Sequence, residues 1–310
     1  MFNCNKLQIL IYHRVLNEPD PMRPGEMDVS LFETQMKILR QHFNPLGLSE
    51  GLYRLKSGTL PKRAVAITFD DGYKDNLSHA WPILKRYDLK PTIFVATGFL
   101  NSGIMWNDAI IELVRRSQDV LDLTKDRLGC MPVGTLSEKL TTARYLIQSL
   151  KYCHPDLRNE VIDKVKSTIG LSIPADLMMT VTDIQQLALE GVEIGAHTVT
   201  HPILSKIPFE VAETEIMESK LFLEGILGQS IKYFAYPNGN PGVDYHLSHR
   251  NFLKTAGFEA GFSTWWAAAN RQMDFYQLPR FTPWDTSRVK FRLRMLQYRF
   301  KSVGRALKIR

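Results

Sequence analysis

Short apolar segments that alternate with stretches of helical spacing are the feature that most constrains the fold of this chain. Leu7–Tyr12 and Ala64–Phe69 read as buried strands, and a helical pattern over residues 30–42 lies between them. The strand series continues at 92–96, 192–196, 231–236 and 260–264, with helical patterns at 76–87, 208–226 and 245–256. Such alternation is typical of α/β proteins with a mainly parallel sheet. We therefore predict an α/β fold.

Residues 102–180 interrupt the alternation. They contain no clear strand, and helical spacing recurs at 107–118, 137–152 and 157–168. We interpret this region as a helical insertion in one barrel-like domain over residues 1–287, followed by a separate C-terminal helix at 288–310. A wall of the substrate groove is one role we consider for the insertion.

Carboxylates follow the second predicted strand directly, as Asp70-Asp71-Gly72. Adjacent carboxylates repel each other unless a cation or a proton separates their roles. Gly72 permits a tight turn, so that one carboxylate can bind a metal while the other acts as a base. Asp-Gly pairs are also common in ordinary surface turns, so this motif alone does not decide between the two readings.

Two histidines follow the strand at 192–196, as His197 and His201 in the segment HTVTH. On a short helical turn they would meet on one face and reach the same Zn²⁺, and Pro202 would stop the turn. A pair of core or surface histidines is the plain alternative. Together with Asp71 they offer three protein ligands and an open position, the pattern of a catalytic metal site.

These residues carry a resemblance. TFDDGY at 68–73 and HTVTH at 197–201 resemble the first two motifs of the polysaccharide deacetylase family, also called the NodB-homology or carbohydrate esterase 4 family, and FAYPNG at 234–239 resembles its third. The resemblance spans roughly residues 7–285. It implies a distorted (β/α) barrel, a divalent metal that is usually zinc, and removal of N-acetyl groups from amino-sugar polymers.

The resemblance also implies roles for individual residues. Asp70 would be the general base, and Asp71, His197 and His201 would bind the metal. In the third motif, the backbone N–H of Asn238, after Pro237, would help to hold the oxyanion.

The sequence departs from the family pattern in two places. The third motif usually carries an Arg that orients the catalytic Asp, but Ala235 stands there. Arg280, in the segment LPRF, is our substitute, because an Arg can clamp a carboxylate with two parallel hydrogen bonds; a surface Arg is the alternative.

The usual late Leu-x-His motif, the source of the general acid, is also absent. His13, in the segment YHRV at the end of the first strand, resembles the N-terminal motif of biofilm poly-N-acetylglucosamine deacetylases, where an early His supplies the acid. A satisfied structural histidine is the alternative.

Aromatic residues near these motifs are candidates for stacking on sugar rings, although such residues more often pack in the core. We single out Trp106 and Tyr236 as substrate contacts. Trp265, Trp266 and Trp284 are further candidates.

The C-terminal segment explains the net charge of +7. Residues 288–310 hold nine Lys and Arg residues and no Asp or Glu, so removing those nine charges leaves −2 on residues 1–287. Its apolar residues form one helical stripe: Val289, Leu293, Leu296, Phe300, Val303 and Leu307. Such a helix suits an anionic membrane surface, or packs on the barrel with a solvated basic face. Nucleic-acid binding is not expected, since no recognition motif accompanies the charge.

Three scattered cysteines, with no CxxC pair, favour a reducing compartment. With no signal peptide or membrane span in view, we expect a cytoplasmic protein, peripheral at the inner membrane face if the basic helix binds lipid. The leading hypothesis is a metal-dependent N-deacetylase of an amino-sugar polysaccharide or its precursor. The alternatives are a deacylase of a lipid-linked sugar and a non-catalytic sugar-binding homologue.

Overall fold

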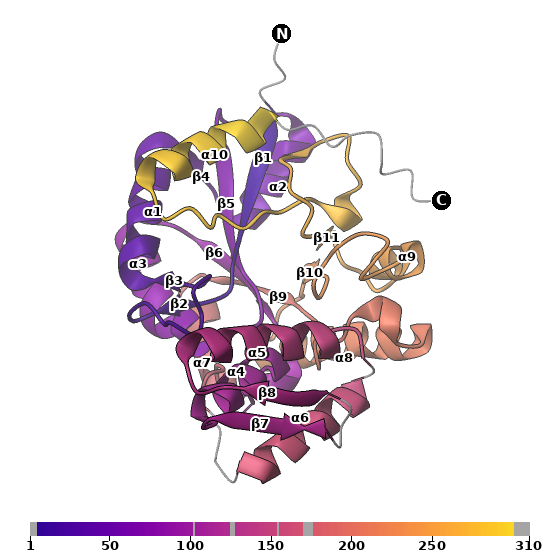
Figure 1. Cartoon of the computed structure of the whole chain (residues 1–310). Coiled ribbons are helices and arrows are strands. Elements are labelled where there is room, and N and C mark those ends of the chain that lie inside the picture. Colours follow the sequence, from indigo (N-terminus) through magenta and orange to yellow (C-terminus); the bar gives the residue numbers. More distant parts are fainter. Residues whose placement is uncertain (1–4, 102, 125–127, 154, 170–175, 301–310) are drawn as a thin grey trace.

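The fold is built on one curled, mainly parallel sheet, seen in the computed structural model in Figure 1. The structure describes residues 5–101, 103–124, 128–153, 155–169 and 176–300. Strand order is β11-β10-β9-β6-β5-β1-β12, and β4 also pairs with β5. The strands are β1 (Lys6–Tyr12), β4 (Asn44–Pro45), β5 (Ala64–Phe69), β6 (Pro91–Val95), β9 (Glu193–Ala196), β10 (Tyr233–Ala235), β11 (Ala260–Phe262) and β12 (Ala269–Asn270).

A short extended segment joins the two sides of the curled sheet. Leu278 pairs with Phe262 on β11, and Phe281 pairs with Leu10 on β1. The backbone of Phe281 also exchanges hydrogen bonds with Ile9 and Ile11. Segment 278–281 therefore bridges β11 and β1, and the predicted α/β barrel-like fold is confirmed.

Helices cover the outside of this sheet, and their apolar faces form the main core with the strands. Buried Phe32, Met36 and Leu39 represent the inner face of the first helix. The helices around the sheet are α1 (Val29–His42), α2 (Leu48–Ser57), α3 (Trp81–Arg86, after a π-helical turn at Asn76–Ala80), α7 (Val181–Leu189), α8 (Phe209–Leu227) and α9 (Leu247–Thr255). A small parallel pair, β2 (Val15–Leu16) and β3 (Met27–Asp28), lies beside α1.

The predicted insertion has its own hydrophobic cluster, lower in Figure 1. It contains α4 (Trp106–Arg116), α5 (Leu136–Leu150) and α6 (Pro155–Ile169), near the three predicted helices. The prediction that the region lacks strands is wrong: β7 (Val120–Leu123) and β8 (Gly129–Pro132) form an antiparallel pair. Both strands are short, and each places only alternate residues in the core. The division of the chain at 287 stays a prediction.

The C-terminal helix α10 (Arg288–Phe300) packs on the barrel beside α1 and β1. Phe291, Met295 and Tyr298 form its buried face. Val289 and Leu293 of the predicted stripe are instead 66% and 60% exposed. Residues 301–310, with Val303 and Leu307 of the stripe, lie outside the described residues, so membrane binding stays a prediction. Among the described helices, none combines the length and apolar character needed to cross a bilayer.

Parallel strands fix where the functional side chains meet. Tyr12 on β1 pairs with Phe69 on β5, and Val95 on β6 pairs with Ala196 on β9. The residues just after these positions are at the carboxyl ends of neighbouring strands, and so at one edge of the sheet. His13, Asp70 and His197 are therefore brought together by strand register.

Candidate active site

Asp71, His197 and His201 converge to form a group that can hold a metal ion. Asp71 Oδ1 lies 3.4 Å from Nε2 of His197 and 3.4 Å from Nε2 of His201. The ligand atoms of the three residues all lie within 4.8 Å of one another. Asp71 Oδ1 is buried and makes no hydrogen bond in the structure. A buried carboxylate oxygen without a hydrogen-bond partner, facing two imidazoles, fits a bound cation.

The backbone around these ligands is shaped by unusual dihedral angles, which corrects the sequence prediction. We expected HTVTH to form a helical turn. Instead, Thr198 and His201 have φ of 67° and 53°, and Asp71 has φ of 75°. The His201 N–H donates to Thr198 Oγ1 at 3.1 Å. A non-glycine residue in this region is strained, and for the β-branched Thr198 it is a clear outlier, so neighbouring contacts must hold the turn.

Those contacts come from α8 and from the loop after β6. Glu215 accepts hydrogen bonds from the backbone N–H groups of Val199 and Thr200, both at 2.8 Å, and from the Thr200 hydroxyl at 2.6 Å. From the other side, the Gly98 N–H donates to the Val199 carbonyl at 2.8 Å. Sequence reasoning missed Glu215, because a Glu on a helix usually points into solvent.

The His197 ring is oriented by the third motif. Its Nδ1 lies 2.7 Å from the carbonyl oxygen of Ala235, which accepts a hydrogen bond when Nδ1 carries the proton. Such a bond leaves Nε2 available to a metal and fixes the ring plane. Ala235 occupies the position where the family usually has Arg, and its backbone still supports the site.

Burial and charge act in opposite directions on these groups. Burial would raise the pKa of Asp71, but the neighbouring His197 and His201 hold it well below its ordinary value. Burial lowers the pKa of His201 to about 4, which favours a neutral imidazole. Burial would also lower the pKa of His197, but contact with Asp71 and the charge of Asp70 raise it. An ionised carboxylate beside a neutral imidazole is the protonation state that metal binding needs.

Asp70 and Arg280 form a bidentate ion pair inside the barrel. Arg280 Nη1 donates to Asp70 Oδ1 at 2.7 Å, and Nη2 donates to Oδ2 at 2.8 Å. Arg280 is 0% exposed and Asp70 is 3% exposed. Burial would raise the pKa of Asp70, but Arg280, with His197, lowers it below its usual value. The carboxylate is therefore held ionised and fixed in orientation.

His13 directly follows β1, which pairs with β5, so it lies at the same edge of the sheet as Asp70. The Asp70 N–H donates to the Tyr12 carbonyl at 2.9 Å, which fixes the backbone of His13 beside Asp70. The charge of His13 acts on the pKa of both Asp70 and Asp71, so the three side chains are electrostatically linked. Its backbone carbonyl accepts a hydrogen bond from Asn76 Nδ2 at 2.8 Å.

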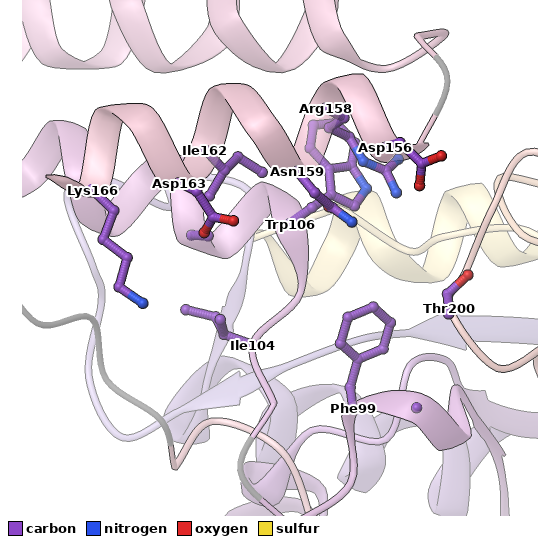
Figure 2. Close-up of a pocket in the computed structure, with 12 residues that line it drawn as sticks. Phe99, Ile104, Trp106, Asp156, Arg158, Asn159, Ile162, Asp163, Lys166 and Thr200 are labelled. Carbon is purple, nitrogen blue, oxygen red and sulfur yellow. The ribbon is translucent and has the colours of Figure 1, made fainter.

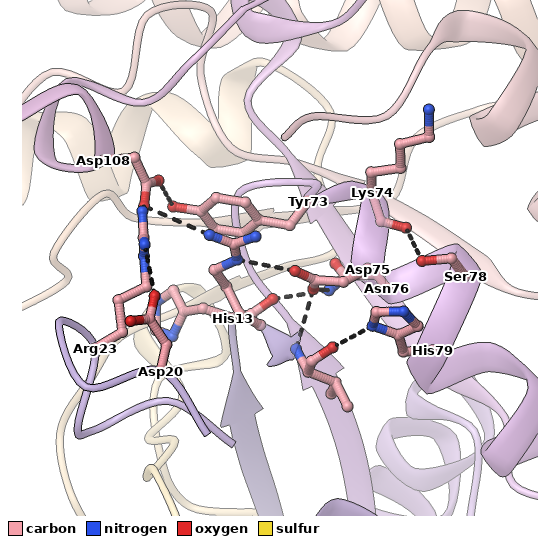
Figure 3. Close-up of polar contacts among 12 residues, drawn as sticks. His13, Asp20, Arg23, Tyr73, Lys74, Asp75, Asn76, Ser78, His79 and Asp108 are labelled. Atoms are coloured by element: carbon pink, nitrogen blue, oxygen red, sulfur yellow. Dashed lines mark hydrogen bonds and ion pairs between the residues drawn. The ribbon is translucent and has the colours of Figure 1, made fainter. Parts of the chain in front are cut away.

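A buried polar network supports the loop that carries His13, as Figure 3 shows. Arg14 Nε donates to Asp75 at 2.8 Å, and the Tyr73 hydroxyl donates to Asp108 at 2.7 Å. Arg23 also pairs with Asp108 at 2.9 Å. Asp108 lies on α4, so the network ties the insertion to the loops after β1 and β5. The sequence alone gave no signal for this arrangement, since its members come from four separate segments.

The family model that describes polysaccharide deacetylases matches residues 57–261. The chain belongs to the polysaccharide deacetylase family. The family assignment places it among hydrolases that act on carbon–nitrogen bonds other than peptide bonds, and the Asp-His-His group fits the metal dependence of such enzymes.

Two named relatives match this chain over different shares of its length, and one solved structure shares its fold. YxkH of Bacillus subtilis, whose name assigns it to the same family, is 23% identical over 277 residues, which are 89% of this chain and 70% of that protein. The poly-β-1,6-N-acetyl-D-glucosamine N-deacetylase of Staphylococcus aureus is 46% identical over 70 residues, 22% of this chain and 24% of that protein. The structure of the deacetylase PplD of Streptococcus pyogenes superposes with a TM-score of 0.62 at 21% identity, and covers 94% of this chain and 97% of that one.

Within the third motif, Tyr236 and Pro237 are buried, whereas Asn238 is partly exposed. Tyr236 is 1% exposed, stacks on Tyr245 and donates its hydroxyl to the Tyr276 carbonyl at 2.8 Å. Tyr236 is therefore a core residue, and this burial contradicts its predicted contact with substrate. Pro237 is also buried. Asn238 is partly exposed with φ of 57°, and its N–H donates none of the hydrogen bonds found in the described chain.

The predicted aromatic contacts lie in different places. Trp106 is partly buried at the start of α4, and the Arg158 guanidinium lies 4.7 Å from the centre of its ring. Trp266 packs edge-on against Trp284, which is 61% exposed. Of these, Trp106 lines a cleft beside HTVTH and stays a candidate substrate contact.

Replacing Glu215 with glutamine should weaken metal binding by about tenfold or more. The amide can accept fewer of the three hydrogen bonds at the strained turn, and a hydrogen bond to a charged group contributes about 1.5–3 kcal/mol. Competition with a chromophoric chelator would measure the affinity. Glu218→Gln, an exposed site on the same helix, serves as the control. Equal affinities of the wild type and the Glu215 variant would show that the turn holds itself.

Proposed function

We propose that this protein removes N-acetyl groups from an amino-sugar polysaccharide or its precursor in a metal-dependent reaction. The observation that carries the proposal is the pairing of two sites at one sheet edge. An Asp-His-His group has a buried oxygen without a hydrogen-bond partner, and the adjacent Asp70 is held ionised by Arg280. A metal site with a neighbouring fixed base suits hydrolysis by water.

Zn²⁺ is the metal we propose. Two imidazole nitrogens and one carboxylate form a common catalytic zinc set, and three protein ligands leave a position open. The hydrogen bond from His197 Nδ1 to Ala235 is the kind of outer contact that orients a zinc ligand. A bound zinc ion would polarise the acetyl carbonyl and make water more acidic.

Residues of this chain would carry out the proton transfers and would stabilise the negative charge that develops on the carbonyl oxygen. Asp70 accepts the proton of the attacking water, and Arg280 keeps its carboxylate oriented during the transfer. The Asn238 N–H donates a hydrogen bond to the carbonyl oxygen as negative charge develops there. His13 donates a proton to the departing sugar amine, which leaves as a neutral group. The products are acetate and a free amino sugar.

Acetate release from N-acetylglucosamine oligomers tests the proposal directly. The wild type should release acetate, a chelator should abolish release, and added Zn²⁺ should restore it. Mass spectrometry should show a loss of 42 Da for each acetyl group removed. Binding of the oligomers without any acetate release from amino-sugar substrates would instead favour a non-catalytic sugar-binding protein.

A further inference from the structure

The insertion and the barrel enclose a cleft of about 320 Å³ next to the HTVTH segment. Gly98 and Thr200 contribute the barrel side, and Trp106 and residues of α6 contribute the other side. Figure 2 shows Trp106, Asn159 and Lys166 across the gap from Phe99 and Thr200. In the sequence Thr200 lies between the two histidines of the Asp-His-His group, so the cleft borders the segment that carries them.

Arg158, on α6, is the unusual residue of this cleft. It is 4% exposed, and its buried Nε has no hydrogen-bond partner. Among the hydrogen bonds and ion pairs of the described residues, none involves Arg158. Its guanidinium lies 4.7 Å from the centre of the Trp106 ring. Burial lowers the pKa of Arg158, the opposite of what a paired arginine shows.

A buried guanidinium without an anion is costly for the folded protein. Taking a charged group out of water has a large penalty unless a partner compensates it. The other buried arginines among the described residues have such partners: Arg280 pairs with Asp70, and Arg14 and Arg23 pair with acidic groups. Uncompensated groups that destabilise the free protein are typical of binding sites.

We propose that Arg158 binds an anionic group, a carboxylate or a phosphate, carried by a sugar next to the one that is deacetylated. The guanidinium offers a planar set of donors that matches either anion. The Trp106 ring against its face holds the donor plane and provides an apolar surface for the sugar. This inference rests on the proposed function and adds to it a charge requirement on the substrate.

Other polar groups of the cleft limit which anions fit. Asn159 and Lys166 add donors, but Asp156 and Asp163 also line the cleft. All four are exposed, whereas Arg158 is buried. The two carboxylates would repel a chain with many negative charges, such as a nucleic acid. The site therefore selects a glycan with one anionic group that reaches Arg158.

Calorimetric titration tests this selection with three ligands. They are an N-acetylglucosamine tetramer, the same tetramer oxidised to a carboxylate at its reducing end, and the tetramer with a phosphate there. Titrations use the Asp70→Asn protein, so that turnover does not interfere. The same protein with Arg158→Met keeps the length of the side chain but removes its charge. Arg144→Met, at an exposed position on α5, is the matched control.

In the protein with Arg158, at least one charged tetramer should bind about ten- to a hundredfold more tightly than the neutral one. Whichever charged tetramer gains more identifies the anion. Arg158→Met should remove the difference while leaving the Kd of the neutral tetramer and the Tm unchanged or improved. Arg144→Met should keep the difference.

Two results would overturn the inference: equal binding of all three tetramers, or an Arg158→Met protein that loses Tm and binds every tetramer more weakly, as a structural arginine would. Acetate release by the wild type keeps the two proposals apart. Release from the neutral tetramer without any preference for charge would leave the proposed function standing and the anion site refuted. A preference for charge without release would do the reverse.

Discussion

Replacing Asp70 with asparagine should reduce acetate release by about two to four orders of magnitude, the usual contribution of a general base. The amide has nearly the shape of the carboxylate, so it can still accept a hydrogen bond from Arg280. It cannot take a proton from water. The metal group does not include Asp70, so metal content should stay unchanged. Acetate assays and elemental analysis of the purified proteins would measure both quantities.

Asp88→Asn is a suitable control, because Asp88 is exposed and asparagine tolerates its φ of 51°. Loss of metal together with activity in the Asp70 variant would show that Asp70 is a ligand rather than a base. Unchanged activity with unchanged metal would mean that another group accepts the proton.

Strand register explains why so much of the site could be predicted from the sequence. Leu7–Tyr12 and Ala64–Phe69 are apolar except for Gln8 and Thr68 and are buried on both sides, so their limits are sharp in the sequence. Once the strands are parallel, residues that follow them share one edge. The meeting of Asp71 with His197 therefore followed from local patterns combined with one rule of topology.

Features that depend on distant segments were not predictable in the same way. Nothing in LPRF shows that residues 278–281 bridge β11 and β1, which is what turns Arg280 into the barrel towards Asp70. The turn at Thr198 depends on Glu215, which lies seventeen residues further along the chain on α8. The pair β7–β8 was missed because its strands have four residues each, and β8 contains Gly129 and Pro132, which are uncommon in strands.

The face of α10 that packs on the barrel could not be predicted from the sequence either. The sequence contains two apolar stripes on this helix, and periodicity alone does not say which one packs. Phe291, Met295 and Tyr298 were left out of the predicted stripe, yet they contact the barrel. Phe291 and Tyr298 are large aromatic residues, which favours burial of this face. The Gln8 side chain also donates a hydrogen bond to the Met295 carbonyl at 2.7 Å, which helps to hold this face against the barrel.

Arg280→Met should have the largest effect on stability, about 3–5 kcal/mol, the usual cost of removing one partner of a buried ion pair. It leaves Asp70 buried without its cation. Burial then dominates, and the pKa of Asp70 should rise above its ordinary value instead of lying below it. In the wild type, the pair contributes stability above the unfolded-state pKa of Asp70 and loses it as pH falls through the lower folded-state pKa.

The variant should behave in the opposite way. A raised folded-state pKa favours the protonated carboxyl, so the variant should be least stable relative to the wild type at neutral pH, and the difference should shrink as pH falls. Its acetate release should also increase with pH over a range where the wild type is constant, because the base must first ionise. Denaturant unfolding and kcat/KM measured at several pH values would follow both quantities.

The double variant Asp70→Asn with Arg280→Met completes the cycle. It removes both charges, so its stability should recover part of what Arg280→Met alone loses. If the double variant is as unstable as the sum of the two single variants, the cost lies in lost packing of the Arg280 side chain, and the ion pair is not what holds Asp70. A pH profile of Arg280→Met that matches the wild type would lead to the same conclusion, because the pKa of Asp70 would then not depend on the guanidinium.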